Sequence, residues 1–409
     1  MSDTDARHQA APLIRRLAKA LLISGVPSQN LEHALITVAA RFGLRAQFFA
    51  TPTSVMGAIG DDDSQDVFLI RGHSGDVDVS RTDALYDRLK VMMDHEVDAD
   101  AEREEIARIL DAPPLYPPLM DLVAYILLSA CVARVFGGGA FEVTAAAAIG
   151  SLTGLLSIAA THSETWARIA APVASFLAGV IATMASGFIT SFGTYLVTIA
   201  GLIALLPGLT LTTAARELAA GHLVSGSSRM AGAAMLFLII GFGVAVGRAL
   251  GAMFQTALGQ HAIDAVLIPL PDWSLYLALV GSTMALTVLF RIRAHRYHWV
   301  LLAGLLAFIT ARYGAIVGGP ATGAGLGAIV IGIGGNLYAR YADHASVNFH
   351  VPGLMMLVPG AIGFRGLSAF LQNDVTAGIE AAFTAVLVAV ALATGLVLAN
   401  ALFPSRRLL

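Results

Sequence analysis

The sequence predicts an α-helical polytopic membrane protein with a small α+β N-terminal cytoplasmic domain. Of its 409 residues, 56% are hydrophobic and only 13% are charged, about half the charged share of an average soluble domain. Both lysines, Lys19 and Lys90, and the acidic clusters lie before about Asp111. Beyond that point, runs of about 20 apolar residues recur, the length that a helix needs to cross a bilayer.

The soluble domain is expected over residues 1–112. Apolar side chains at helical spacing predict helices over 8–24 and 29–42, and a third helical stretch over 82–110. Stretches rich in β-branched residues predict strands over 46–60 and 66–80, on either side of the turn Asp61-Asp62-Asp63. A proline-rich linker, Pro113-Pro114 with Pro117-Pro118, then leads into the membrane.

About ten membrane-spanning helices fit the rest of the chain. Orientation follows from the rule that cytoplasmic loops are enriched in Arg and Lys. A cytoplasmic N-terminus then places two basic segments in the cytoplasm, the connection Arg291–Arg296 and the C-terminal pair Arg406-Arg407, in agreement with the rule. Arg312 and Arg365 fall on the external side, against the rule. The predicted spans lie near 116–136, 142–161, 169–188, 193–210, 230–250, 273–291, 297–315, 319–339, 346–362 and 380–403.

An internal repeat divides these spans into five plus five. The segment Gly201-Leu-Ile-Ala-Leu-Leu-Pro-Gly208 returns as Gly353-Leu-Met-Met-Leu-Val-Pro-Gly360, 152 residues later (359 minus 207). An odd number of spans per copy inverts the second copy, so residues 113–262 and 263–409 are expected to form an inverted repeat. Each Pro-Gly would interrupt its helix, unless it is only a loop at the end of a span.

Interrupted helices in such repeats present unpaired N–H groups near the bilayer midplane, which suit a carboxylate. Ionisable residues inside spans are costly, so each of them is a candidate for function. Asp121 could instead cap or pair with a neighbouring helix. The candidates for proton coupling are Asp121, His350 and Glu217, and the candidates for substrate binding are Pro207, Gly208, Thr210, Thr213, Asn348, His350, Pro359, Gly360 and Arg365.

The chain resembles the threonine/serine exporter family. The resemblance rests on Ser24-Gly25-Val26-Pro27, on Phe49-Ala50-Thr51-Pro52-Thr53, on the duplicated Leu-x-Pro-Gly, and on Arg216-Glu217-Leu218. It implies a proton-driven secondary exporter of small hydroxy amino acids in a bacterial inner membrane, and split two-chain relatives imply dicarboxylates as the alternative substrate. The segment Asn30-Leu31-Glu32 departs from the family pattern, where a basic residue is expected before the glutamate.

Other functions receive less support. A hydrolase would have to use Ser24 and His33, the only suggestive pair, so no enzyme activity and no cofactor are expected; a channel or a sensory membrane protein stays an alternative. Cys131 is the only cysteine, and no metal-ligand spacing occurs. The net charge of -3 and the expected lack of a basic patch in the head argue against nucleic acid. The expected partners are the small carboxylate-bearing substrate, protons and membrane lipid, and a homo-oligomer is compatible with the sequence.

Overall fold

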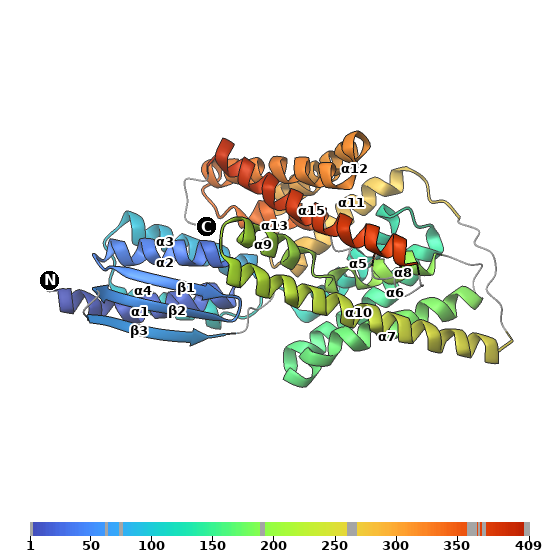
Figure 1. Ribbon diagram of the computed structural model, residues 1–409, viewed down its shortest axis with the longest axis horizontal. Coiled ribbons are helices and arrows are strands. Elements are labelled where there is room, and N and C mark those ends of the chain that lie inside the picture. The colour runs from blue at the N-terminus through green and yellow to red at the C-terminus, as the bar shows by residue number, and fades with distance from the viewer. Residues whose placement is uncertain are drawn as a thin grey trace.

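The computed structural model places a small α+β unit at one end of an elongated bundle of helices (Figure 1). It describes residues 3–61, 64–72, 77–188, 193–259, 268–357, 366, 369 and 374–404. We call residues 3–111 the head and residues 118–402 the body. Both ends of the head sequence contribute to its packing, because α1 lies against α4 as well as against the sheet.

The head combines four helices with an antiparallel sheet of order β1-β2-β3. The predicted strand 46–60 is wrong: it is a hairpin, because Pro52 cannot donate a ladder hydrogen bond and the Thr51 hydroxyl accepts from Ser54 N at 3.0 Å in the turn. The predicted helix 82–110 is two helices, because Asp98 caps a new one. The elements are α1 Asp3–Ile23, α2 Ser28–Arg41, β1 Ala46–Thr51, β2 Ser54–Asp61, β3 Ser64–Arg71, α3 Val79–Asp94 and α4 Ala99–Asp111.

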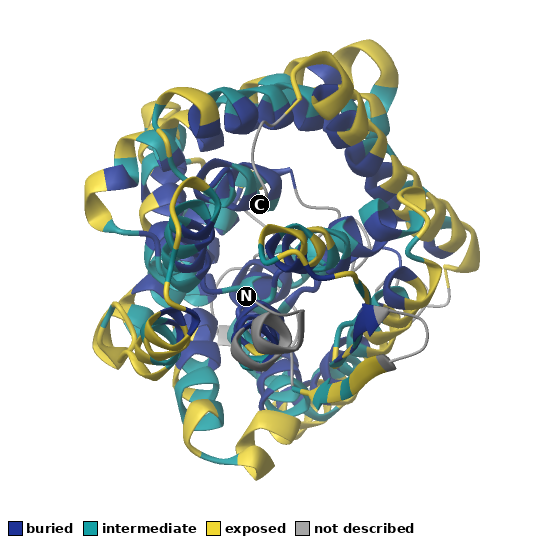
Figure 2. Ribbon diagram, turned by 90° about the vertical axis from the view of Figure 1, so that its left-hand side faces the viewer, coloured by how far each residue is buried: buried dark blue, intermediate teal, exposed yellow. Residues whose placement is uncertain are grey.

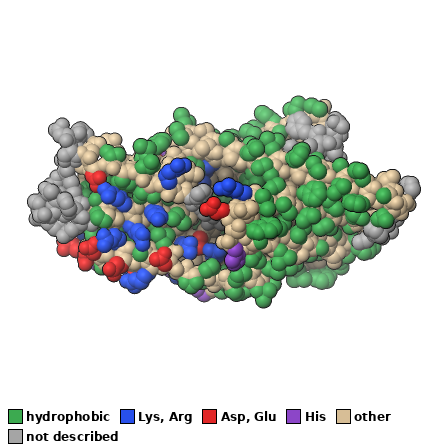
Figure 3. All heavy atoms as spheres, turned by 90° about the horizontal axis from the view of Figure 1, so that it is seen from below, with side chains coloured by type: hydrophobic (Ala, Val, Ile, Leu, Met, Phe, Trp, Pro, Cys, Tyr) green, Lys and Arg blue, Asp and Glu red, His purple; other side chains and the backbone are tan. Residues whose placement is uncertain are grey.

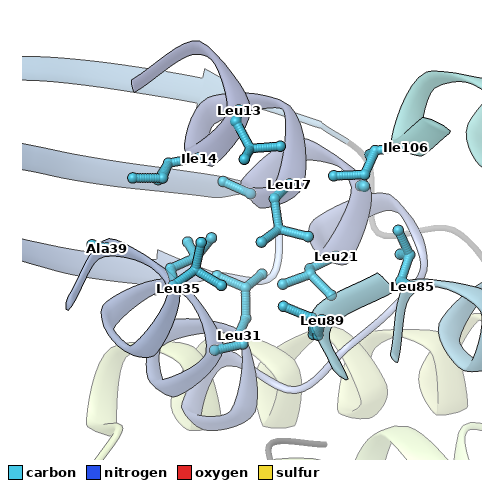
Figure 4. Packing of buried hydrophobic residues seen from close by; sticks show 14 of the residues in the cluster. Leu13, Ile14, Leu17, Leu21, Leu31, Leu35, Ala39, Leu85, Leu89 and Ile106 are labelled. Atoms are coloured by element: carbon cyan, nitrogen blue, oxygen red, sulfur yellow. The ribbon is translucent and has the colours of Figure 1, made fainter. Parts of the chain in front are cut away.

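Leucine-rich faces of these helices form the core of the head. On α1, Leu13, Leu17 and Leu21 are fully buried, and they meet Leu31 of α2 and Leu89 of α3 (Figure 4). The spacing of three to four residues places each set on one side of its helix. Removal of this apolar area from water is the main force that folds the head.

The body contains apolar helices at the positions of the predicted spans, although those over Thr194–Leu202 and Val347–Met356 are only 9 and 10 residues long. By length and composition, six of the described helices could cross a membrane, and seven could if the bent pair α8 and α9 forms one span. The body is thus polytopic, while the number ten stays a prediction. The elements are α5 Pro118–Val135, α6 Ala140–His162, α7 Glu164–Phe188, α8 Thr194–Leu202, η1 Ile203–Leu205, α9 Gly208–Ala219, α10 Leu223–Ala257, α11 Trp273–Leu289, η2 Ala294–Arg296, α12 Tyr297–Tyr341, α13 Val347–Met356 and α15 Val375–Leu402.

Helix α12 is a hairpin rather than one rod. Its backbone leaves the helical region at Gly318 and Gly319, where φ of Gly319 is 82°, and Pro320 follows. A straight helix would separate Ala311 and Gly323 by about 18 Å. Instead, a Cβ atom placed on Gly323 would lie 2.4 Å from the Ala311 carbonyl oxygen. The chain therefore reverses at Gly318-Gly319, as expected for two spans over 297–315 and 319–339.

Helices of the body turn small residues inward and large apolar residues outward. Figure 2 shows exposed surfaces around the outside of the bundle and buried surfaces within it, and Figure 3 shows the hydrophobic cover of the body. Val317 is 84% exposed and Phe242 is 70% exposed. Contiguous exposed apolar surface of this extent is unfavourable in water and favourable against lipid.

Two pairs of helices repeat the sequence offset of the Pro-Gly segments. Helix α10 begins at Leu223 and α15 begins at Val375, 152 residues apart (375 minus 223). Helix α8 begins at Thr194 and α13 at Val347, 153 residues apart (347 minus 194). Helices α8 and α10, one before and one after the first Pro-Gly, thus have counterparts α13 and α15 at nearly the same offset.

Candidate functional site

The first Pro-Gly interrupts a helix in the middle of the body. The segment of α8 and η1 ends at Leu205, α9 begins at Gly208, and the two axes differ by 60°. Pro207 caps α9, and Gly208 N donates to Leu206 O at 2.8 Å across the break. Since Leu211 N also bonds to Pro207 O, the N–H groups of residues 209 and 210 are the donors left without an acceptor among the described residues, beside the partial positive charge of the helix start.

Three threonines line the first turns of α9. Thr212 donates back to Gly208 O at 3.1 Å, so its hydroxyl is used within the helix. Thr210 and Thr213 are half-buried, and neither hydroxyl bonds to any of the residues that the structure describes. These two hydroxyls are available to a polar ligand beside the break.

Helix α13, which precedes the second Pro-Gly, packs directly against α9. It carries Asn348, which is buried, and His350, whose Nε2 lies 3.2 Å from Gly332 O of α12. The structure therefore places the helix that carries these two candidates beside α9, the helix that begins at the first break. Three further predicted site residues, Pro359, Gly360 and Arg365, lie outside the described residues.

Glu217, at the end of α9, is fully buried in a polar network that reaches the head. Its Oε1 accepts from Ser28 N of α2 at 2.9 Å. Its Oε2 accepts from the Ser225 hydroxyl at 2.7 Å and from Arg229 Nε at 3.1 Å, both on α10. Ser28 Oγ and Ser225 Oγ lie 2.6 Å apart. We call these four residues the Glu217 latch, because they join two body helices to the head.

A second buried network joins α3 of the head to η2 and α13. Asp83 Oδ2 lies 2.6 Å from Arg296 Nη1, and the two side chains are 1% and 4% exposed. Asn348 Nδ2 donates to Asp83 Oδ1 at 2.9 Å. A buried charge pair persists only where its remaining polar atoms are also bonded. We call Asp83, Arg296 and Asn348 the Asp83 latch; Asn348 is thus occupied by the head.

Asp121 lies apart from α9 and α13, at the seam between head and body. It lines a cavity of about 230 Å³ together with Asp78, Arg81 and Arg291. Arg291 Nη1 lies 3.2 Å from Asp78 Oδ2. The Asp121 carboxylate makes no hydrogen bond to a described residue, so it keeps its capacity to accept one within the cavity.

The segment that departs from the family pattern also touches the body. Asn30 Oδ1 accepts from Arg216 Nη2 at 3.0 Å, a contact that a basic residue would replace with repulsion. Glu32 accepts from Ala50 N at 2.7 Å and lies 3.6 Å from His222 Nδ1. Burial raises the pKa of Glu32, against the lowering effects of the Ala50 hydrogen bond and of His222.

Sequence reasoning missed most of these head partners. Ser28 and Glu217 are 189 positions apart, and Asp83 and Asn348 are 265 apart. No spacing rule connects such pairs. The one sequence signal for a contact with the head was the basic connection Arg291–Arg296, because two of its arginines bind aspartates of the head. In the sequence analysis this connection served only to assign membrane topology.

Comparison with known families agrees with this architecture. A family model described as "Putative threonine/serine exporter" matches residues 12–251, and a second, "Threonine/Serine exporter, ThrE", matches residues 275–402. The chain belongs to the threonine/serine exporter family. Head and body are both included in the first match, so the resemblance noted in the sequence is confirmed over nearly the whole chain.

Curated relatives of this exporter family member occur in yeasts under the name "Pheromone-regulated membrane protein 10". The protein of Eremothecium gossypii is 26% identical over 402 residues, covering 94% of this chain and 53% of the relative. That of Saccharomyces cerevisiae is 26% identical, covering 94% and 49%. The chain thus spans about half the length of these relatives. No solved structure matches it significantly.

Proposed function

We propose that this protein exports threonine or serine across a bacterial inner membrane, as a proton-coupled secondary transporter that works by alternating access. Membership of the exporter family is the observation that carries the proposal. The break at Pro207 and the repeated helix offset support an inverted repeat of residues 113–262 and 263–409 behind a head of residues 1–112. In this proposal the protein is not an enzyme.

The substrate site lies in this proposal at the start of α9. The free N–H groups of its first turn suit the substrate carboxylate. The unbonded hydroxyls of Thr210 and Thr213 suit the hydroxyl of threonine or serine. Pro359, Gly360 and Arg365 would complete the site from the second copy of the repeat.

The head covers the cytoplasmic side in this proposal. Both latches attach it to helices that carry candidate site residues, Glu217 on α9 and Asn348 on α13. Inward opening would have to separate these contacts. The loop with Arg291 and Arg296 binds the head, which agrees with a cytoplasmic position for both under the positive-inside rule.

Proton coupling would use Glu217, with Asp121 and His350 as further candidates. A protonated Glu217 loses the charge that favours Ser28 N and Arg229, so protonation would weaken the latch. The cavity beside Asp121 offers carboxylates and guanidiniums together, a combination that matches the ammonium and the carboxylate of an amino acid. It would serve as a cytoplasmic vestibule.

Counterflow in proteoliposomes tests the proposal. Vesicles loaded with unlabelled threonine should transiently accumulate labelled threonine, and Pro207→Ala should abolish this accumulation. Pro172→Ala is the matched control, since Pro172 lies inside α7, away from the break. Accumulation of succinate but not threonine would favour the dicarboxylate alternative. Flux that follows voltage without counterflow would indicate a channel and refute the carrier.

A further inference from the structure

The head carries a groove of about 510 Å³ between α1, α4 and β3. Four basic side chains line it, from Arg15, Arg16 and Lys19 on α1 and Arg103 on α4, with Glu104 as the single acid. The expectation that the head lacks a basic patch is therefore wrong, because folding brings these four side chains together. The side of the head seen in Figure 3 carries many Lys and Arg side chains, in contrast to the apolar body.

Helical geometry explains how the cluster forms. Arg15, Arg16 and Lys19 are spaced by three and four residues, so they share one face of α1. Leu13 and Leu17, on the other face, are fully buried in the core of the head. Packing of α1 against α4 then adds the Arg103 side chain from 84 residues further along the chain (103 minus 19).

Neighbouring acids leave part of this charge unpaired. Arg15 forms an ion pair with Asp66 and lies over the Phe68 ring, 5.5 Å from its centroid. Arg103 Nη2 lies 3.3 Å from Asp100 Oδ1 on its own helix. Among the described residues, neither Arg16 nor Lys19 has an anionic partner.

Two buried donors in the groove also lack acceptors. The Nε atoms of Arg15 and Arg16 are buried and bond to no described atom. Buried polar atoms are nearly always hydrogen-bonded, and one left unpaired in a charged group is costly. Both arginine side chains thus keep unused hydrogen-bonding capacity, and an anion in the groove would neutralise Arg16 and Lys19.

We propose that this groove binds a phosphate-bearing anion. Guanidinium groups match phosphate oxygens in two-pronged geometry, and lysine adds a compact charge. Pro12, Ile70 and Ala107 supply an apolar wall for an organic part, and the volume is within the range of small-molecule sites. The phosphate comes either from a soluble ester or from an anionic lipid headgroup. Helix α1 ends at Ile23 in the Asp121 cavity, so the same helix connects the groove to the seam.

Hydrogen exchange of the full-length protein in nanodiscs distinguishes the two sources. Pyrophosphate added to phosphatidylcholine nanodiscs should slow amide exchange in residues 12–19 and 103–107 if the phosphate is soluble. Nanodiscs that contain phosphatidylglycerol should slow the same amides without pyrophosphate if a lipid headgroup binds. Exchange that is unchanged in both arms overturns the proposal.

Charge-removing variants test whether the groove itself is responsible. In whichever arm shows protection, the double variant Arg16→Gln, Lys19→Gln should need at least about tenfold more of that ligand for half-maximal protection. The reason is that two charge-assisted contacts are lost. Arg108→Gln is the matched control, an exposed arginine of α4 outside the groove that pairs with Glu105. Equal weakening by the control would show non-specific attraction and overturn the site. If the double variant fails to fold, Arg16→Lys, which keeps the charge but removes the two-pronged guanidinium, should raise the ligand concentration for half-maximal protection by a smaller factor; an unchanged concentration would overturn phosphate recognition by this groove.

Discussion

Head and body bury different kinds of side chain. Among the described residues, eleven Leu, Ile or Met side chains of the head are less than 2% exposed, whereas the much longer body has only seven Leu, Ile or Phe side chains buried to that extent. In the body, helices meet through small residues: a Cβ on Gly247 of α10 would lie 2.0 Å from Phe176 O of α7. Water drives large apolar groups inward in the head, whereas lipid offers no such force and close packing of small residues joins the helices instead.

A network of charges crosses the boundary between these two regions, and breaking it should produce the largest effect. Asp83→Asn leaves Arg296 buried without its counter-charge, so we expect a loss of about 3–5 kcal/mol of unfolding free energy. Denaturant unfolding of the detergent-solubilised protein measures this loss. Lys90→Gln is the control; it breaks the half-exposed ion pair with Asp343 and should cost no more than about 1 kcal/mol. Equal effects of both variants would show that Asp83 and Arg296 are not desolvated together.

The core of the head should tolerate truncation poorly. Leu89→Ala removes a fully buried side chain of α3 and should cost about 2–5 kcal/mol in the same unfolding measurement, through lost burial and the cavity that remains. Leu69→Ala, on the outer face of the sheet, removes a side chain that is 59% exposed and should change stability little. A large cost at Leu69 would mean that this sheet face is covered in the intact protein.

The body should instead be sensitive to enlargement. Gly247→Ala forces α7 and α10 apart and should destabilise the protein by about 1–3 kcal/mol. Gly232→Ala tests the same substitution on the same helix, where no atom lies within 4 Å, so it should be neutral or stabilise slightly through helix propensity. Thermal unfolding and gel filtration in detergent compare the two. Similar melting temperatures would refute close packing at Gly247.

The smallest expected effect concerns pH at the edge of the head. Burial raises the pKa of Glu32 above its ordinary 4.5, so the folded state holds this proton more tightly than the unfolded state. Its stabilising contribution is complete below pH 4.5 and is lost as pH rises through the folded pKa. His222 and Glu217 face the same carboxyl group.

Melting temperature against pH tests this linkage. Relative to Glu32→Gln, the wild-type protein should gain stability as pH falls from neutral toward 4.5. Asp87, whose pKa is also raised by burial, titrates in both proteins and cancels in the difference. Glu104→Gln controls for removal of one exposed acid. Parallel curves for wild type and Glu32→Gln would exclude the linkage.

Prediction from sequence worked best where a local pattern determines the structure. The apolar runs located the helices of the body, and Pro207-Gly208 marked a break of 60°. It failed at the hairpin after Thr51 and at the new helix after Asp98, because each depends on a single side-chain hydrogen bond that periodicity does not register. The partners of Glu217 and Asn348 were also beyond it, because they lie 189 and 265 positions away.

The sequence by itself determined the membrane class, the position of most helices, the first interruption and the family. These properties follow from hydrophobicity, backbone geometry and local motifs, which short stretches of chain carry alone. Only the tertiary structure decided that Glu217 and Asn348 are held by the head, that Asp121 lies in a seam away from α9, and that four basic residues share one groove. Such contacts depend on how folded elements meet in space, and distance along the chain does not encode them.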